Sequence, residues 1–123
     1  MSHIVKVKVD MKNKPMVMES IRQLGLECLG EGKHKLFSNQ TAEGIAFKLP
    51  GWSYPVVINP VTGEAVYDNY GGNWGAQIEL DKVVQRYSLE VAKEQAMLSG
   101  FSTTEEKLEN GDVKLRMEAL QTS

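Results

Sequence analysis

The stretch from Gly63 to Phe101 constrains the fold more than any other part of this 123-residue chain. A run typical of a β-strand ends at Asp68, and a loop rich in glycine and aromatic residues follows over 69–75. The spacing of apolar residues then predicts an amphipathic helix over 79–99. Gly100 can end that helix because glycine readily adopts the left-handed conformation found after a helix. A strand followed by a long helix predicts a protein with both α and β structure.

Local patterns predict the remaining elements. Alternating apolar and polar residues predict strands over 4–9 and 45–49. Residues 56–58 are all apolar, and with residues 64–68 they flank a turn over 59–63, which predicts a hairpin of two further strands. Asn13-Lys14-Pro15 is expected to start a first helix, with proline in its first turn, and Gly25 is expected to be its C-cap. Residues 30–44 are polar and irregular, with at most a short strand near Leu36. The sequence thus predicts one α+β domain over 1–123, with element order β-α-β-β-β-α-β-β. We expect an antiparallel sheet of five to six strands with two helices packed on one face.

The end of the chain predicts a second hairpin that turns at Asn110-Gly111. A plain two-residue turn would place Leu108 over Val113, but it would also place Glu106 opposite Leu115. A bulge or another register would relieve this mismatch, and the sequence leaves the choice open. The buried stripe of the long helix is expected to comprise Leu80, Val83, Val84, Tyr87, Val91 and Leu98.

Charge and composition narrow the class of protein. The formal net charge of −2 and the pI of about 5.7 argue against a general nucleic-acid binder, which would carry a basic excess. The single cysteine, Cys28, cannot form an internal disulfide and is expected to be a small buried hydrophobe. No segment has the apolar length of a signal peptide or a membrane span. We therefore expect no membrane partner and a cytoplasmic location, or the stroma if the chain is plastid-encoded.

Tests for familiar chemistry give no catalytic, cofactor-binding or metal-binding residue. Gly25 and Gly30 have the glycine spacing of a phosphate loop, but Glu31 stands where the lysine is needed. The supply of zinc ligands is limited to Cys28 and two histidines without paired spacing. Glu105 and Glu106 are adjacent on a predicted strand, so they should point to opposite faces. The sequence leans away from an enzyme and predicts no cofactor.

Five aromatic residues within 23 positions are the feature with most functional potential: Trp52, Tyr54, Tyr67, Tyr70 and Trp74. Displayed on a surface, such rings could anchor a partner protein or stack on bases. The alternative is that the tryptophans pack at the sheet edge with their indole N–H groups bonded to backbone. Packing is the favoured interpretation for Trp74, and both interpretations stay open for Trp52 and Tyr54.

Three functional hypotheses follow. The leading one is a non-enzymatic accessory module that binds another protein or a second copy of itself. The second is a small-ligand or anion-binding protein, or an enzyme, with a cleft near Asp68, Trp74 and Arg86; the ligand itself is unknown. The third is binding of single-stranded nucleic acid through the sheet, using Trp52 and Tyr54 with Lys6 and Lys8. The candidate interaction residues are Trp52, Tyr54, Asp68, Tyr70, Trp74 and Arg86.

Several short segments also carry a family resemblance. They are Met1-Ser2-His3 before the first strand, Leu24-Gly25, Asp68 followed by Trp74-Gly75, Gln85-Arg86-Tyr87, and Gly100-Phe101. In this order the chain resembles the family of hypothetical chloroplast open reading frame 35, a domain of unknown function found in cyanobacteria, plastids and other bacteria. The resemblance implies a small α+β protein and no established activity.

The chain departs from the pattern of that family at two places. Tyr70-Gly71-Gly72-Asn73 lengthens the gap between Asp68 and Trp74, and Tyr54-Pro55 stands where family members tend to have Tyr-Asp. A function that depended on that acidic position would therefore not carry over to this chain.

Overall fold

The computed structural model describes residues 4–120, with residues 38 and 71 described by their backbone alone. It confirms an α+β fold with two helices and antiparallel sheets. The chain divides into two compact units, Met1–Tyr87 and Ser88–Ser123, and the division falls inside the second helix. Neither helix of the described residues is both long and apolar enough to cross a bilayer.

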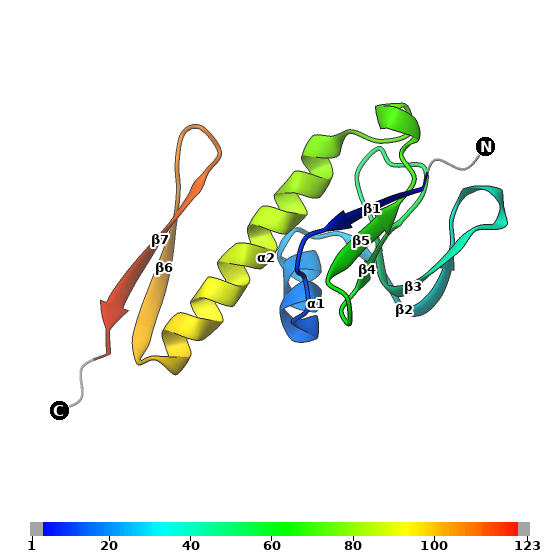
Figure 1. The fold of residues 1–123 in the computed structure, drawn as a ribbon. Helices are drawn as coiled ribbons and strands as arrows, with labels where there is room; N and C mark the ends of the chain where they lie inside the picture. Colours follow the sequence, from blue (N-terminus) through cyan, green and yellow to red (C-terminus); the bar gives the residue numbers. More distant parts are fainter. Residues whose placement is uncertain (1–3, 121–123) are drawn as a thin grey trace. The chain divides into compact units, whose positions relative to one another are not determined.

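Five strands form one sheet in the order β1-β5-β4-β3-β2, and every neighbouring pair is antiparallel (Figure 1). Two further strands form a separate hairpin, β6-β7. In chain order the elements are β1 (Val5–Lys8), α1 (Lys14–Gln23), β2 (Glu27–Lys35), β3 (Thr41–Lys48), β4 (Val56–Asn59), β5 (Glu64–Tyr67), α2 (Gln77–Leu98), β6 (Phe101–Lys107) and β7 (Val113–Ala119). Short 3₁₀ turns, η1 (Phe37–Asn39) and η2 (Tyr70–Gly72), precede β3 and α2.

The five-stranded sheet carries much of the core of the first unit, on the face to which Phe47 belongs and at Ala46 and Val57 on the opposite face. The register places Phe47 opposite Val56 and Ile58 opposite Ala65, and all four are completely buried. Tyr67 shares this face, and its hydroxyl donates to Gln77 Oε1 at the start of α2 (3.3 Å). Burial raises the pKa of that hydroxyl; the bond to Gln77 opposes the shift and Asp81 adds to it.

The two helices contribute to the same unit. Val17 and Ile21 of α1 are buried, as are Leu80 and Val83 of α2. The hydroxyl of Tyr87 on α2 accepts a hydrogen bond from the backbone N–H of Asn13, the residue that caps α1 (3.0 Å). A long-range polar contact thus joins the start of α1 to α2.

Local capping signals are confirmed at the end of α1. Gly25 has φ +66°, and its N–H donates to the Arg22 carbonyl (3.0 Å). Leu26 N–H donates to the Ile21 carbonyl (3.0 Å), which completes the hydrogen-bond pattern of a helix closed by a left-handed glycine.

The expectation of irregular structure over 30–44 is wrong, because β2 and β3 form a long hairpin there. Gly32 lies opposite Gly44 in this pairing, and the register shifts between Cys28 and Gly30. A Cβ on Gly44 would lie 2.2 Å from the carbonyl oxygen of Ile58, so glycine is required for β3 to approach β4 this closely. The extra strand makes the observed order β-α-β-β-β-β-α-β-β.

The C-terminal hairpin forms a two-stranded sheet of its own instead of joining the larger sheet. Its register pairs Lys107 with Val113 and Glu105 with Leu115, so the plain two-residue turn is wrong. Leu108 N–H donates to the Asp112 carbonyl across a longer loop, in which Gly111 has φ +90°. The mismatch of a glutamate opposite Leu115 persists with Glu105, whose carboxylate pairs with Lys93 of α2 (2.7 Å).

Two smaller expectations about burial are also wrong. Leu98 is 81% exposed although it continues the apolar stripe of α2. Cys28 is exposed on β2, at the edge of the five-stranded sheet, and is not a buried hydrophobe.

Candidate functional site

A cluster of four aromatic rings gathers side chains from three separate parts of the first unit. Phe37 comes from η1, Tyr54 from the loop between β3 and β4, and Tyr70 and Trp74 from the segment between β5 and α2. We call these four residues the aromatic cluster. Tyr54, Tyr70 and Trp74 are among the candidates from the sequence, whereas Phe37, which follows Leu36 in an otherwise polar stretch, is not.

Trp74 is the centre of the aromatic cluster. Tyr70 stacks on it, with ring centroids 4.6 Å apart and planes 21° apart. Phe37 lies 4.9 Å from Trp74 at a tilt of 55°, and Tyr54 lies 5.5 Å away in an edge-to-face arrangement. Phe37 and Tyr54 also contact each other at 6.0 Å. These separations and angles are those of favourable aromatic pairs, so the rings hold each other in place.

The aromatic cluster is partly open to solvent. Tyr70 is 41% exposed, and the other three rings are half-buried. Trp52, by contrast, is 8% exposed and belongs to a different environment. Its indole N–H donates to the Ala76 carbonyl (3.0 Å), and its ring packs edge-to-face on Tyr67. The packing role proposed for the tryptophans therefore describes Trp52, whereas Trp74 lies in the half-exposed cluster.

Backbone hydrogen bonds fix the loop that carries Tyr70 and Trp74. Trp74 N–H donates to the Asn69 carbonyl (2.9 Å), and the Trp74 carbonyl accepts from Ser53 N–H (2.8 Å), which ties this loop to the one that carries Tyr54. Asn69 is buried, and its side-chain amide donates to the Gly75 carbonyl (3.4 Å). The rings therefore project from a framework with little freedom to rearrange.

Tyr70 itself has a backbone conformation that tyrosine rarely adopts. Its φ of +48° lies in the left-handed region, where a side chain with a Cβ is strained. The Asp68 carboxylate accepts a hydrogen bond from the Tyr70 N–H (3.2 Å), which stabilises this turn. Such strain costs about 1–3 kcal/mol, and residues that retain it concentrate at functional sites.

The structure places the other candidate residues as follows. Asp68 is completely buried beneath the loop, with one carboxylate oxygen on the Tyr70 amide. Arg86 is half-buried on α2, with its Nε atom buried, and takes part in interactions within the chain. Asp68 thus has a clear structural role in shaping the aromatic cluster.

Lys6 and Lys8 alternate with Val5 and Val7 on β1, and Val5 lies opposite Tyr67. The lysines therefore face away from the side of the sheet on which Trp52 packs against Tyr67. Lys6 lines a separate hollow of about 310 Å³ with Glu43, Glu64 and Val66 among its other residues. Trp52 therefore does not share a face of the sheet with Lys6 and Lys8.

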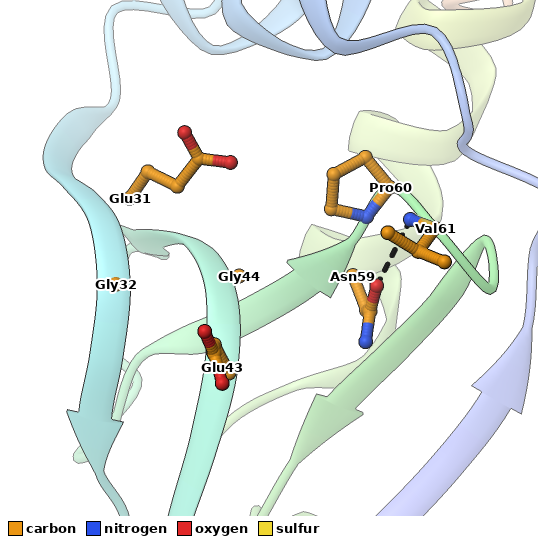
Figure 2. A pocket seen from close by; sticks show the side chains of 7 residues that line it. All are labelled: Glu31, Gly32, Glu43, Gly44, Asn59, Pro60 and Val61. Atoms are coloured by element: carbon orange, nitrogen blue, oxygen red, sulfur yellow. Dashed lines mark hydrogen bonds between the residues drawn. The ribbon is translucent and has the colours of Figure 1, made fainter.

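A second hollow of about 390 Å³ lies between the β2-β3 hairpin and the turn after β4 (Figure 2). It is open where Gly32 and Gly44 face each other without side chains. Glu31 extends into it from β2 and is paired with Lys14 of α1 (2.9 Å), while Asn59 is occupied in its own turn through the Val61 N–H (2.9 Å). The hollow contains none of the candidate residues.

Within residues 4–120, no group of three or more His, Cys, Asp or Glu side chains is arranged to hold a metal ion. Comparison with known protein families, with curated proteins and with solved structures finds no match for this chain. The resemblance to the chloroplast reading-frame family therefore stays a prediction, and the geometry of the aromatic cluster carries the functional argument.

Proposed function

We propose that this protein is a non-enzymatic accessory module that binds a partner protein through the aromatic cluster. One observation carries the proposal: four rings from three chain segments are held half-exposed on a hydrogen-bonded loop, with Tyr70 in a strained backbone conformation. Tyrosine and tryptophan dominate the energetic centres of protein interfaces because they offer large, rigid apolar area with a polar atom at the edge.

Preorganisation supports the same proposal. A partner that docks on rings already fixed in place does not pay the entropy of ordering them, which is a main cost of association. The bonds between Trp74 and Asn69 and between Ser53 and Trp74 fix the backbone before any partner arrives. The partner would meet an apolar surface whose hydroxyl groups, on Tyr54 and Tyr70, offer hydrogen bonds.

A photo-crosslinking amino acid at Tyr70, in the full chain expressed in its native host, tests the proposal. We expect a specific adduct with one protein, and we expect Tyr54→Ala to abolish that adduct while leaving the fold intact. The same crosslinker at Val61 is the matched control, because Val61 is 84% exposed in the turn after β4 and lies outside the aromatic cluster. Equal adducts from both positions, or none at Tyr70, would contradict the proposal.

The two tryptophans separate this proposal from base stacking. In Trp52→Phe, Trp74 is the sole tryptophan and reports directly on the aromatic cluster. We expect its fluorescence to be unchanged by a single-stranded oligonucleotide at low salt. A salt-sensitive fluorescence change would instead support nucleic-acid binding.

We place the protein in the cytoplasm, or in the stroma if it is plastid-encoded. The chain has a single cysteine and cannot form an internal disulfide, which supports a location in a reducing compartment. Thiol counting on protein isolated from its host tests it: the exposed Cys28 should be reactive, and a blocked, disulfide-linked thiol would contradict a reducing location.

A further inference from the structure

The second compact unit leaves most of its apolar side chains uncovered. Among its described residues, the buried side chains are Glu90 and Ala96. Six apolar residues of this unit are at least 37% exposed: Met97, Leu98, Phe101, Leu108, Met117 and Leu120. An isolated two-stranded hairpin is at best marginally stable in water. A surface with this many exposed apolar side chains is more typical of a protein–protein interface than of a surface that faces solvent alone.

The outer edge of β7 offers an unpaired row of backbone groups. Leu120 N–H donates to the Gly100 carbonyl, and Leu108 N–H donates to the Asp112 carbonyl, which sets the alternation of hydrogen-bonded pairs along the hairpin. The even-numbered residues of β7 therefore bond to β6. The N–H and C=O groups of Leu115, Met117 and their odd-numbered neighbours point to the other edge, where no strand pairs in the described part of the chain.

We propose that two copies of this chain dimerise by antiparallel pairing of their β7 strands about a two-fold axis at Met117. The pairing would form a four-stranded sheet, with the order β6-β7 in one copy continuing into β7-β6 of the second copy. The odd-numbered groups of both strands would satisfy each other, because the two-fold axis places odd residues opposite odd residues.

The charge pattern of β7 selects this occupant and this register. With the axis at Met117, Arg116 lies opposite Glu118 of the second copy, and the same pair occurs twice by symmetry. These are non-hydrogen-bonded pairs, in which opposing side chains approach most closely. Moving the axis to Arg116 would place that arginine opposite itself, and moving it to Leu115 would place Lys114 opposite Arg116. Of these three registers, the one with its axis at Met117 places opposite charges directly opposite each other and no like charges directly opposite each other.

The apolar face of β7 benefits from the same arrangement. Met117 is 59% exposed, and in the dimer it would lie opposite Met117 of the second copy at the centre of the sheet. Leu115 would lie opposite Ala119 of the second copy on the same face. Arg116 already contacts Glu106 of its own hairpin (3.4 Å), and its exposed guanidinium can contact a second carboxylate as well.

Sedimentation equilibrium of the full chain over a wide range of concentration tests the proposal. We expect a reversible monomer–dimer equilibrium for the wild type. Arg116→Glu should weaken the dimer about tenfold or more, because it converts two attractive pairs into two repulsive ones. The double variant Arg116→Glu/Glu118→Arg should restore dimerisation, and Lys107→Glu, on β6, is the matched control with the same change in charge.

Met117→Pro tests the backbone contacts separately, since it removes an N–H that β6 does not use. We expect it to abolish the dimer, while Met117→Thr, which keeps the N–H, should retain it. Circular dichroism checks that each variant is folded. A wild type that is monomeric at every concentration would overturn the proposal, as would a charge-swapped double variant no better than Arg116→Glu. A dimer unaffected by Met117→Pro would place the interface elsewhere and would overturn it too.

Discussion

Residues 4–87 and residues 88–120 differ in how their side chains are stabilised. The first set buries an apolar core around the five-stranded sheet, and Ala96 is the sole buried hydrophobic residue among the described residues of the second. The second set instead has the ion pairs of Lys93 with Glu90 and Glu105. The Lys93 side chain is 29% exposed, so water screens its ion pairs in part and they contribute far less than a buried core. Stability should therefore be distributed unevenly between the units.

Removing a large core side chain should give the largest effect. Phe47→Ala leaves a cavity at a completely buried position and should lower the free energy of unfolding by about 3–5 kcal/mol. Leu98→Ala, at an 81% exposed position of the second unit, should change it by less than about 0.5 kcal/mol. Urea denaturation followed by far-ultraviolet circular dichroism measures both, because both units contain helix or strand. Similar losses for the two variants would show that the contrast between the units is wrong.

Overpacking at Gly75, the residue after Trp74, should lower the free energy of unfolding by less than Phe47→Ala does. A Cβ at Gly75 would lie 2.4 Å from the Trp52 ring, so Gly75→Ala should destabilise the first unit by up to about 3 kcal/mol. Trp52→Phe supplies a smaller ring and should recover part of that loss in the double variant. A double-mutant cycle measured by urea denaturation gives the coupling energy. Strict additivity would mean that the two residues are not in tight contact.

Removing the hydrogen bond between Asp68 and the loop that carries Tyr70 should lower the free energy of unfolding by a smaller amount still. Asp68→Ala leaves the Tyr70 N–H without its carboxylate partner and should lower stability by about 1–2 kcal/mol. Near-ultraviolet circular dichroism should show a weaker aromatic signal, because the Tyr70–Trp74 stack loses its fixed backbone. Asp68→Asn, which keeps an acceptor oxygen, is the control and should retain most of the signal. An unchanged spectrum for Asp68→Ala would contradict a rigid loop.

The smallest expected effect is the loss of stability at alkaline pH, when Lys93 of the second unit loses its charge. The hydrogen bond to Glu105 raises the pKa of Lys93, partial burial opposes the shift, and Glu90 reinforces it. A raised pKa in the folded state means that the ion pairs contribute fully below the ordinary lysine value of 10.5 and are lost as the pH rises through the folded value. The contribution should be below about 1 kcal/mol.

Carbon-13 NMR titration of the Lys93 Cε atom measures this shift directly. Glu105→Gln removes the charge of the first partner and should lower the Lys93 midpoint towards the ordinary value. A midpoint that does not move in this variant would show that Glu105 does not hold Lys93 in solution.

The sequence predicts the local features of this chain better than its contacts between distant segments. Gly25 ended α1 as expected because a helix cap is decided by a few neighbouring residues. The strand β2 was missed because Glu27–Lys35 contains two glycines and several charged residues, and pairing with β3 overrides that weak local preference. Phe37 was missed because its neighbours in the aromatic cluster, Tyr54 and Trp74, are distant in sequence. A contact between distant segments leaves no periodic signal in the sequence.

The irregularity at Cys28 and Gly30 has a consequence for how the protein behaves at high concentration. β2 is a nine-residue edge strand, and an edge of that length can template open-ended addition of further chains. The register shift interrupts its regular row of backbone groups, and alternating exposed charges such as Lys33 and Lys35 raise the cost of docking another strand. β7 pairs with β6 without such a register shift, and its exposed Arg116 and Glu118 carry opposite charges that can pair across a two-fold axis. Pairing through β7 about a two-fold axis would therefore close after two chains, while the β2 edge resists growth into fibrils.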